Sequence, residues 1–135
     1  MRAMMQRAKE WLGMKKELKV PPSEVKAEFL LFHGNLLVGT LSLTEGRWRF
    51  EYSDEFKLKT DLRPLVEFPD LDKVYENEEL WQFFVSRIPS TEQPDVEEVL
   101  ENENIDETDI VALLKRFGKR TISNPFELKY NKAVG

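Results

Sequence analysis

The residue types best suited to catalysis or metal binding are scarce in this sequence. It contains no cysteine and a single histidine, His33, which stands beside Gly34. Thiol nucleophiles, disulfide scaffolds, zinc sites with thiolate ligands and metal sites built from several histidines are therefore excluded. One histidine also leaves little with which to build a catalytic triad. We interpret His33 as a turn residue at the edge of a sheet, and the composition argues against an enzyme.

Motifs that bind nucleotides or cations are missing as well. The sequence has no G-x-G-x-x-G, no G-x-x-x-x-G-K-[ST], no kinase catalytic loop and no D-F-G triplet. The D-x-[DN]-x-[DN]-G spacing of a calcium-binding loop does not occur either. We therefore predict a chain without catalytic residues, without a cofactor and without a bound metal ion.

Charge is distributed unevenly along the 135 residues. The net charge is −5, but between Glu67 and Asp109 fifteen acidic residues stand against two basic ones, so this stretch carries −13 and the remainder +8. An acidic centre repels nucleic acid, and we predict no specific DNA or RNA binding by the chain. Residues 92–109 indicate either a solvated helix face or a docking surface for a basic partner. The basic segment 1–19 could contact phosphates or dock on a partner.

Strand signals begin at Ala27. The spacing of apolar residues and turns predicts strands over 27–32, 36–43 and 47–52. The third of these alternates strictly, which places Trp48 and its apolar neighbours on one face and charges on the other. Three short strands joined by tight turns form a meander with one buried face, and such a meander needs a helical cover.

Helical signals follow the strands. Asn77 is predicted to cap a helix over 77–88, a proline opens a second helix over 94–103, and Asp106 is predicted to cap a third over 107–117. The order of strands first and helices afterwards indicates the α+β class. The expected architecture is a small antiparallel β-meander covered by three helices.

The chain divides into a central domain and two ends. We expect a basic helical or flexible extension over residues 1–26, one domain over 27–130, and a flexible tail over 131–135. No apolar segment of the kind found in secretory signals follows the basic residues, and no run of about 18 apolar residues occurs. The sequence therefore predicts a cytoplasmic protein that does not enter the membrane.

Trp81 is the residue best suited to a partner contact. In the helix predicted over 77–88, Trp81 and Val85 lie at the flank of the apolar stripe, with Glu78 and Gln82 nearby. Tryptophan is enriched among the residues that dominate protein interfaces, and an apolar anchor within a polar surround suits such a role. The alternative is that Trp81 simply widens the core.

Several segments, taken in order, resemble the N-terminal subdomain of HipA-type serine/threonine kinases. In that family the subdomain consists of a strand meander, a sheet-edge segment ending in proline, an F-F helix ending in L-L-P, and a helix closing in a leucine pair and glycine. The resemblance covers roughly residues 27–118. The matching segments are 37–41 (LVGTL), 46–52 (GRWRFEY), 63–65 (RPL), 80–84 (LWQFF) with 88–89 (IP), and 109–114 (DIVALL) with 117–118 (FG).

The sequence departs from the family at two places. Arg87 and Ile88 stand where the family has a leucine pair before proline, and residues 119–126 replace the glycine-rich stretch that leads into the kinase core. We therefore expect that this protein lacks the kinase core. The resemblance therefore implies a stand-alone module similar to HipS, the small component of HipB-HipS-HipT toxin–antitoxin systems.

The function implied by this resemblance is that of an antitoxin. A HipS-like protein binds and neutralises HipT, a shortened HipA-type kinase that acts as the toxin, and a HipB-like protein supplies DNA binding as a further possible partner. The alternative is a small nucleic-acid-associated or scaffolding protein that uses the basic segment 1–19.

Overall fold

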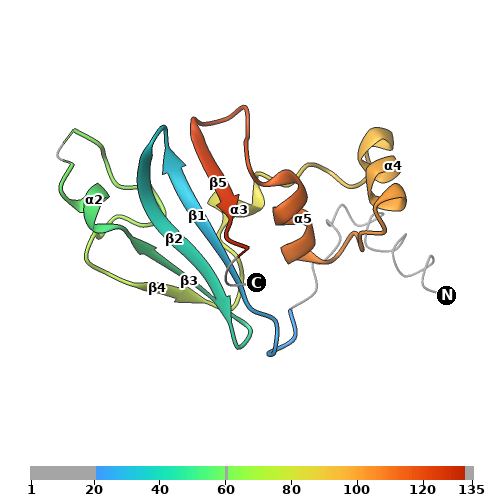
Figure 1. Cartoon of the computed structure of the whole chain (residues 1–135), viewed down its shortest axis with the longest axis horizontal. Coiled ribbons are helices and arrows are strands. Elements are labelled where there is room, and N and C mark those ends of the chain that lie inside the picture. Colours follow the sequence, from blue (N-terminus) through green and yellow to red (C-terminus); the bar gives the residue numbers. More distant parts are fainter. Residues whose placement is uncertain (1–20, 60, 133–135) are drawn as a thin grey trace.

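The computed structural model describes residues 21–59 and 61–132, and its centre is a five-stranded antiparallel sheet of order β4-β3-β2-β1-β5 (Figure 1). Most of the expected extension 1–26 and part of the expected tail 131–135 lie outside the described residues. The elements are β1 (Ala27–His33), β2 (Leu36–Thr44), β3 (Arg47–Tyr52), α2 (Asp54–Lys57), β4 (Tyr75–Asn77), α3 (Gln82–Val85), α4 (Pro94–Asn102), α5 (Ile110–Phe117) and β5 (Phe126–Tyr130). The predicted α+β class is confirmed.

The predicted meander is present as β1, β2 and β3. The alternation in β3 buries Trp48, Phe50 and Tyr52 on one face, and the residues between them are exposed. Glu45 and Gly46 both have positive φ, 52° and 75°, at the turn between β2 and β3. This conformation matches the right-handed twist of the two strands that the turn connects.

Two further strands extend the meander at its edges. β4 pairs with β3, and β5 pairs with β1, which places β1 inside the sheet. His33 is the last residue of β1 and pairs with Leu36 on one side and Phe126 on the other, its ring edge-on to that of Phe126 at 5.4 Å. The expectation of a turn residue at the sheet edge is therefore wrong, because β5 returns from the far end of the chain to cover β1.

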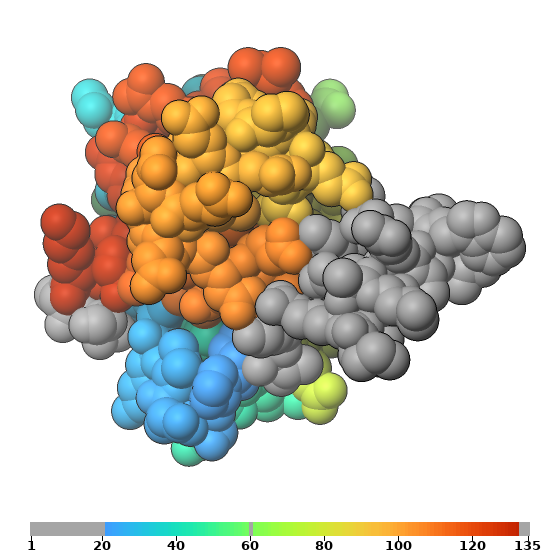
Figure 2. All heavy atoms as spheres, turned by 90° about the vertical axis from the view of Figure 1, so that its right-hand side faces the viewer, coloured from blue at the N-terminus to red at the C-terminus, as the bar shows by residue number. Residues whose placement is uncertain are grey.

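One face of the sheet carries the main core. Buried residues of the strands pack there with α3, with α5 and with the segment 53–75, which contributes Phe56, Leu65 and Phe68. Helix α4 contributes instead to a second cluster, in which its Val96 and Leu100 pack against Leu113 of α5. Figure 2, which faces the α4 side of the molecule, shows α4 with the preceding loop as the outer layer there. The expectation that all three helices cover the sheet is corrected for α4.

The helix expected over 77–88 is much shorter than predicted. Asn77 belongs to β4, where it pairs with Trp48, and α3 begins only at Gln82. Pairing with β3 overrides the capping tendency of Asn77, whose side chain instead donates to the Glu79 carbonyl oxygen at 3.0 Å. The apolar residues of the segment nevertheless face the core as their spacing indicates, since Leu80 and Phe84 are both buried.

The helix expected over 107–117 begins later than predicted. Its N-cap is Asp109, whose carboxylate accepts a hydrogen bond from the Ala112 amide at 3.2 Å. Asp106 forms a separate turn, in which its carboxylate accepts hydrogen bonds from the amide and the hydroxyl of Thr108. Two aspartates three residues apart both have capping character, and only the local backbone decides between them.

Candidate partner-binding site

The irregular segment 53–75 is held to the sheet by one phenol. The Tyr52 hydroxyl donates to the Phe68 carbonyl oxygen at 2.6 Å and accepts from the Leu65 amide at 2.8 Å. Its ring stacks on that of Phe56 at 5.1 Å. Because Tyr52 lies on β3, an interior strand that pairs with β2, these two hydrogen bonds fix the segment 53–75, which supports the residues described next.

Replacing Tyr52 with phenylalanine is expected to lower the free energy of unfolding by about 2 kcal/mol, because the Leu65 amide and the Phe68 carbonyl lose a buried partner. Urea unfolding of the two proteins at neutral pH measures the difference.

The wild-type protein and Tyr52→Phe also test a pH effect, since burial raises the pKa of Tyr52 to about 12. The unfolded phenol ionises first, so its contribution to stability is present below about pH 10 and is lost between about pH 10 and 12. Urea unfolding across this range should show a shallower decline for Tyr52→Phe. An equal decline would contradict the assignment.

Phe68 is the central aromatic residue of this region. Its ring lies 4.5 Å from that of Phe50, 5.0 Å from that of Tyr75 and 6.1 Å from that of Phe84, measured between centroids. The ring of Trp81 meets it edge-on at 5.0 Å. Trp81 is only half-buried, so one part of the indole packs on the core and the rest faces outward. Trp81 thus has features of both alternatives that the sequence left open.

The other three predicted site residues divide into two groups. Trp81 is the N-cap of α3, and its carbonyl oxygen accepts a hydrogen bond from the Val85 amide at 3.1 Å, so half-buried Val85 lies one turn further on. Gln82 opens α3 and is exposed. Glu78 lies before the helix and forms an exposed ion pair with Arg47 at 3.7 Å. The structure therefore groups Trp81, Gln82 and Val85 on α3 but places Glu78 against β3.

A residue that sequence reasoning missed lies beside the start of α3. Val66 is 96% exposed, and its neighbour Glu67 accepts a hydrogen bond from the Phe83 amide at 2.7 Å. This bond ties the turn that carries Val66 to the first turn of α3, where backbone amides have no acceptor within the helix and no side chain of the N-cap residue supplies one. Val66 stands in a stretch without periodicity, so the sequence offers no signal for it.

Arg87 is the second residue that was missed. It is buried, and its guanidinium donates to the carbonyl oxygens of Gly118, Lys119 and Phe126 and to the Asn124 side-chain oxygen. A buried cation is tolerated when hydrogen bonds replace its hydration. One signal existed in the sequence: an arginine stands before Pro89 in a segment, 83–88, whose other residues are apolar except for Ser86.

The electrostatic environment of Arg87 fits this role. Burial lowers the pKa of Arg87 from its ordinary value, and the negative charge of Glu127 opposes that shift. Arginine stays protonated at physiological pH despite such shifts. The side chain therefore acts as a fixed cationic link between the end of α3 and the segment that leads from α5 to β5.

Comparison with protein families shows to which family the chain belongs. The family model of the HipA N-terminal domain matches residues 30–123, which include most of the sheet and helices α2 to α5. The chain belongs to the HipA N-terminal domain family. The matched region contains Trp81 and Arg87 and ends before β5. A comparison with curated protein sequences finds no match to the chain.

The acidic residues of 92–109 in this HipA N-terminal domain lie on α4 and the loops beside it. Their carboxylates are largely exposed, and one of them, Glu103, forms an ion pair with Arg116 at 2.8 Å. Over residues 21–59 and 61–132, no group of three or more potential ligands is placed to hold a metal ion. The helices of that part of the chain are all too short or too polar to cross a bilayer. The basic segment 1–19 lies outside the described residues.

Proposed function

We propose that this HipA N-terminal domain is a non-catalytic interaction module, an antitoxin of the HipS type that binds and neutralises a HipA/HipT-type serine/threonine kinase in the cytoplasm. The observation that carries the proposal is the family match over residues 30–123. The sequence has no phosphate-binding glycine loop and no kinase catalytic motif, which supports a role in binding rather than in phosphoryl transfer.

The surface around α3 supports the same role. A half-buried tryptophan rests on a rigid aromatic cluster, with exposed Val66 on the adjoining turn and exposed Gln82 beside it. Interfaces are typically centred on such aromatic anchors and bordered by polar groups. A kinase surface that accepts Trp81 would meet an anchor whose position is already fixed, so little conformational entropy is lost on binding.

The proposal is tested with a HipA/HipT-type kinase, and the reading frame next to this one is the first place to look for it. Purified protein and kinase are expected to form a stable complex in affinity capture and calorimetry, and co-expression should restore the growth of cells that the kinase arrests. A well-folded protein that neither binds the kinase nor restores growth would refute the proposal. A salt-resistant, sequence-specific shift of duplex DNA by the protein alone would favour the nucleic-acid alternative instead.

A further inference from the structure

A second surface feature lies at the turn between α5 and β5. We call residues 119–125 the 119–125 hairpin, because Thr121 and Asn124 form an antiparallel bridge near its tip. At this tip the side chain of Ile122 is fully exposed. Single exposed apolar residues are common on protein surfaces. A β-branched residue at the tip of a tight turn is not, since turns favour glycine, proline, asparagine, aspartate and serine.

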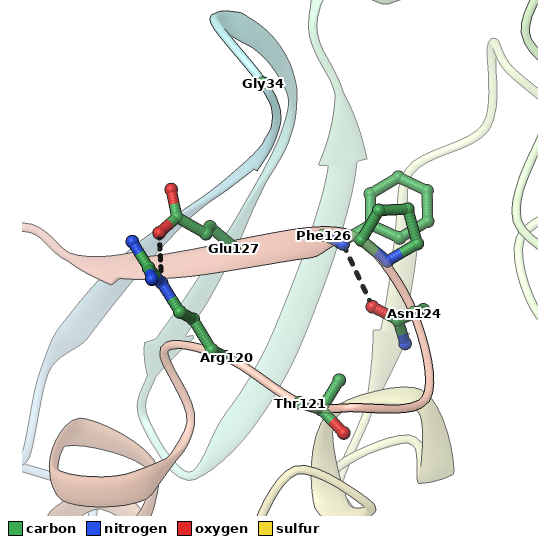
Figure 3. Close-up of a pocket in the computed structure, with 7 residues that line it drawn as sticks. Gly34, Arg120, Thr121, Asn124, Phe126 and Glu127 are labelled. Atoms are coloured by element: carbon green, nitrogen blue, oxygen red, sulfur yellow. Dashed lines mark hydrogen bonds and ion pairs between the residues drawn. The ribbon is translucent and has the colours of Figure 1, made fainter.

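Local hydrogen bonds hold the hairpin in one conformation. The Ser123 amide donates to the Thr121 hydroxyl oxygen at 3.3 Å, and the two hydroxyl oxygens lie 3.0 Å apart. The Asn124 side-chain oxygen accepts from the Phe126 amide at 3.1 Å (Figure 3). Hydrogen bonds within the hairpin therefore hold the residues on both sides of Ile122.

Arg87 holds the same hairpin from beneath. Its guanidinium bonds the Lys119 carbonyl where the hairpin begins, the Asn124 side chain near its tip and the Phe126 carbonyl where β5 begins. One buried side chain thus fixes both ends of the turn. An exposed apolar group on a fixed support is the arrangement that costs least entropy on binding.

The hairpin is continuous with the α3 surface. The ring of Phe83 on α3 meets that of Phe126 edge-on at 5.7 Å, and the Arg87 guanidinium lies over the Phe83 ring at 5.8 Å from its centroid. Rigid contacts therefore join the helix that begins after Trp81 to the hairpin. These contacts fix the position of the hairpin relative to α3.

The surroundings of Ile122 indicate the chemistry of the partner surface. A shallow hollow of about 350 Å³ lies beside the hairpin, lined by Gly34, Arg120, Thr121 and residues 124–127, so that Ile122 stands next to it and not in its lining (Figure 3). Arg120 borders it and pairs with Glu127 at 2.7 Å, while Lys119 and Lys129 are exposed nearby in sequence. The local balance is basic, so a partner with acidic groups around an apolar pocket is complementary to it.

We propose that the 119–125 hairpin is a second docking element for the kinase, with Ile122 entering an apolar pocket that acidic residues border. The inference rests on the proposed function and adds to it a contact outside the α3 surface. It assigns Arg87 the role of a positioning residue, which holds the hairpin and does not itself touch the kinase.

The test compares Ile122→Asp and Ile122→Ala with a matched control, Leu58→Asp. Leu58 is also an exposed apolar residue, but it follows α2, which lies at the left of Figure 1, away from β5. Calorimetric titration with the kinase is expected to show binding weakened at least about tenfold for Ile122→Asp and several-fold for Ile122→Ala. Leu58→Asp should stay within about twofold of wild type, and all three should melt like wild type because both side chains are exposed.

The outcomes separate the two proposals. If the unmodified protein binds the kinase and Ile122→Asp binds equally well, the docking role of the hairpin is refuted while the proposed function stands. If Leu58→Asp weakens binding as much as Ile122→Asp, the loss of affinity comes from adding a negative charge anywhere on the surface, and the docking role of the hairpin is again refuted. If the unmodified protein does not bind, both proposals fail. Should Ile122→Asp melt early, the same titration is made with Ile122→Thr, which keeps the branch at Cβ but has a hydroxyl group in place of the ethyl arm; unchanged affinity of this variant would refute the docking role.

Discussion

Replacing Arg87 with methionine is expected to lower the free energy of unfolding by about 3 kcal/mol or more. Methionine fills much of the space of the arginine stem but donates no hydrogen bond. The carbonyl oxygens of Gly118, Lys119 and Phe126 then lose their shared donor. A buried acceptor left without a partner costs about 1–3 kcal/mol. The Lys119 oxygen keeps the Leu128 amide as a donor at 2.8 Å, so the loss falls on the oxygens of Gly118 and Phe126, and it outweighs the gain from removing a buried charge.

The control for this variant is another arginine of the same chain. Arg116 forms an exposed pair with Glu103, and burial contributes little to such a pair, so Arg116→Met should change stability by less than about 1 kcal/mol. Urea unfolding measures both variants, and amide exchange over residues 118–128 reports whether the loss is local to the hairpin. Arg87→Lys keeps the charge but presents one ammonium in place of the planar fork, and should lie between methionine and wild type. Equal stability of Arg87→Met and Arg116→Met would refute the assigned role.

The parts of the fold that follow from local pattern were predictable. Strict alternation over Arg47–Tyr52 correctly assigned the buried and exposed faces of β3, because a side-chain period of two leaves only one register that buries the aromatic residues. Pro94 correctly marked the first turn of α4. These signals lie within a few residues of the structure that they determine.

The errors arose where distant segments decide the outcome. Asn77 has strong capping character, but the pairing of β4 with β3 places it in a strand. The interior position of His33 depends on β5, which lies more than ninety residues later in the chain. Helix α4 likewise packs on Leu113 of α5 and not on the sheet. The spacing of apolar residues in α4 shows which face is buried but does not identify the element that covers it.

The candidate site was predictable only in part. Trp81 and Val85 could be paired because four residues separate them whether the helix is long or short. Glu78 was placed with them on the assumption of a longer helix, and the structure sets it against Arg47 instead. Arg87 could not be assigned its role, since all the oxygens that it binds lie more than thirty residues further along the chain.

Replacing Trp81 with alanine is expected to weaken binding to the kinase by about 2 kcal/mol or more, which corresponds to about 30-fold in the dissociation constant. The indole is half-buried and rests on Phe68 at 5.0 Å, so the change should also lower stability. That loss should stay below the 3–5 kcal/mol typical of a fully buried tryptophan, about 1–2 kcal/mol, because part of the ring already faces outward. Calorimetric titration well below the melting temperature of the variant measures its affinity for the kinase separately from its stability, because the protein is then folded.

Trp48 provides the matched control for this measurement. It is fully buried in the sheet core, so Trp48→Phe should cost stability of the same order as Trp81→Ala while leaving the affinity of the folded protein for the kinase unchanged. Glu78→Gln should change affinity little, because its ion pair with Arg47 is exposed. If Trp81→Ala loses stability but keeps full affinity, as expected for Trp48→Phe, then Trp81 belongs to the core alone. Loss of affinity beyond that of an equally destabilised Trp48 variant is the result that places the indole in the interface.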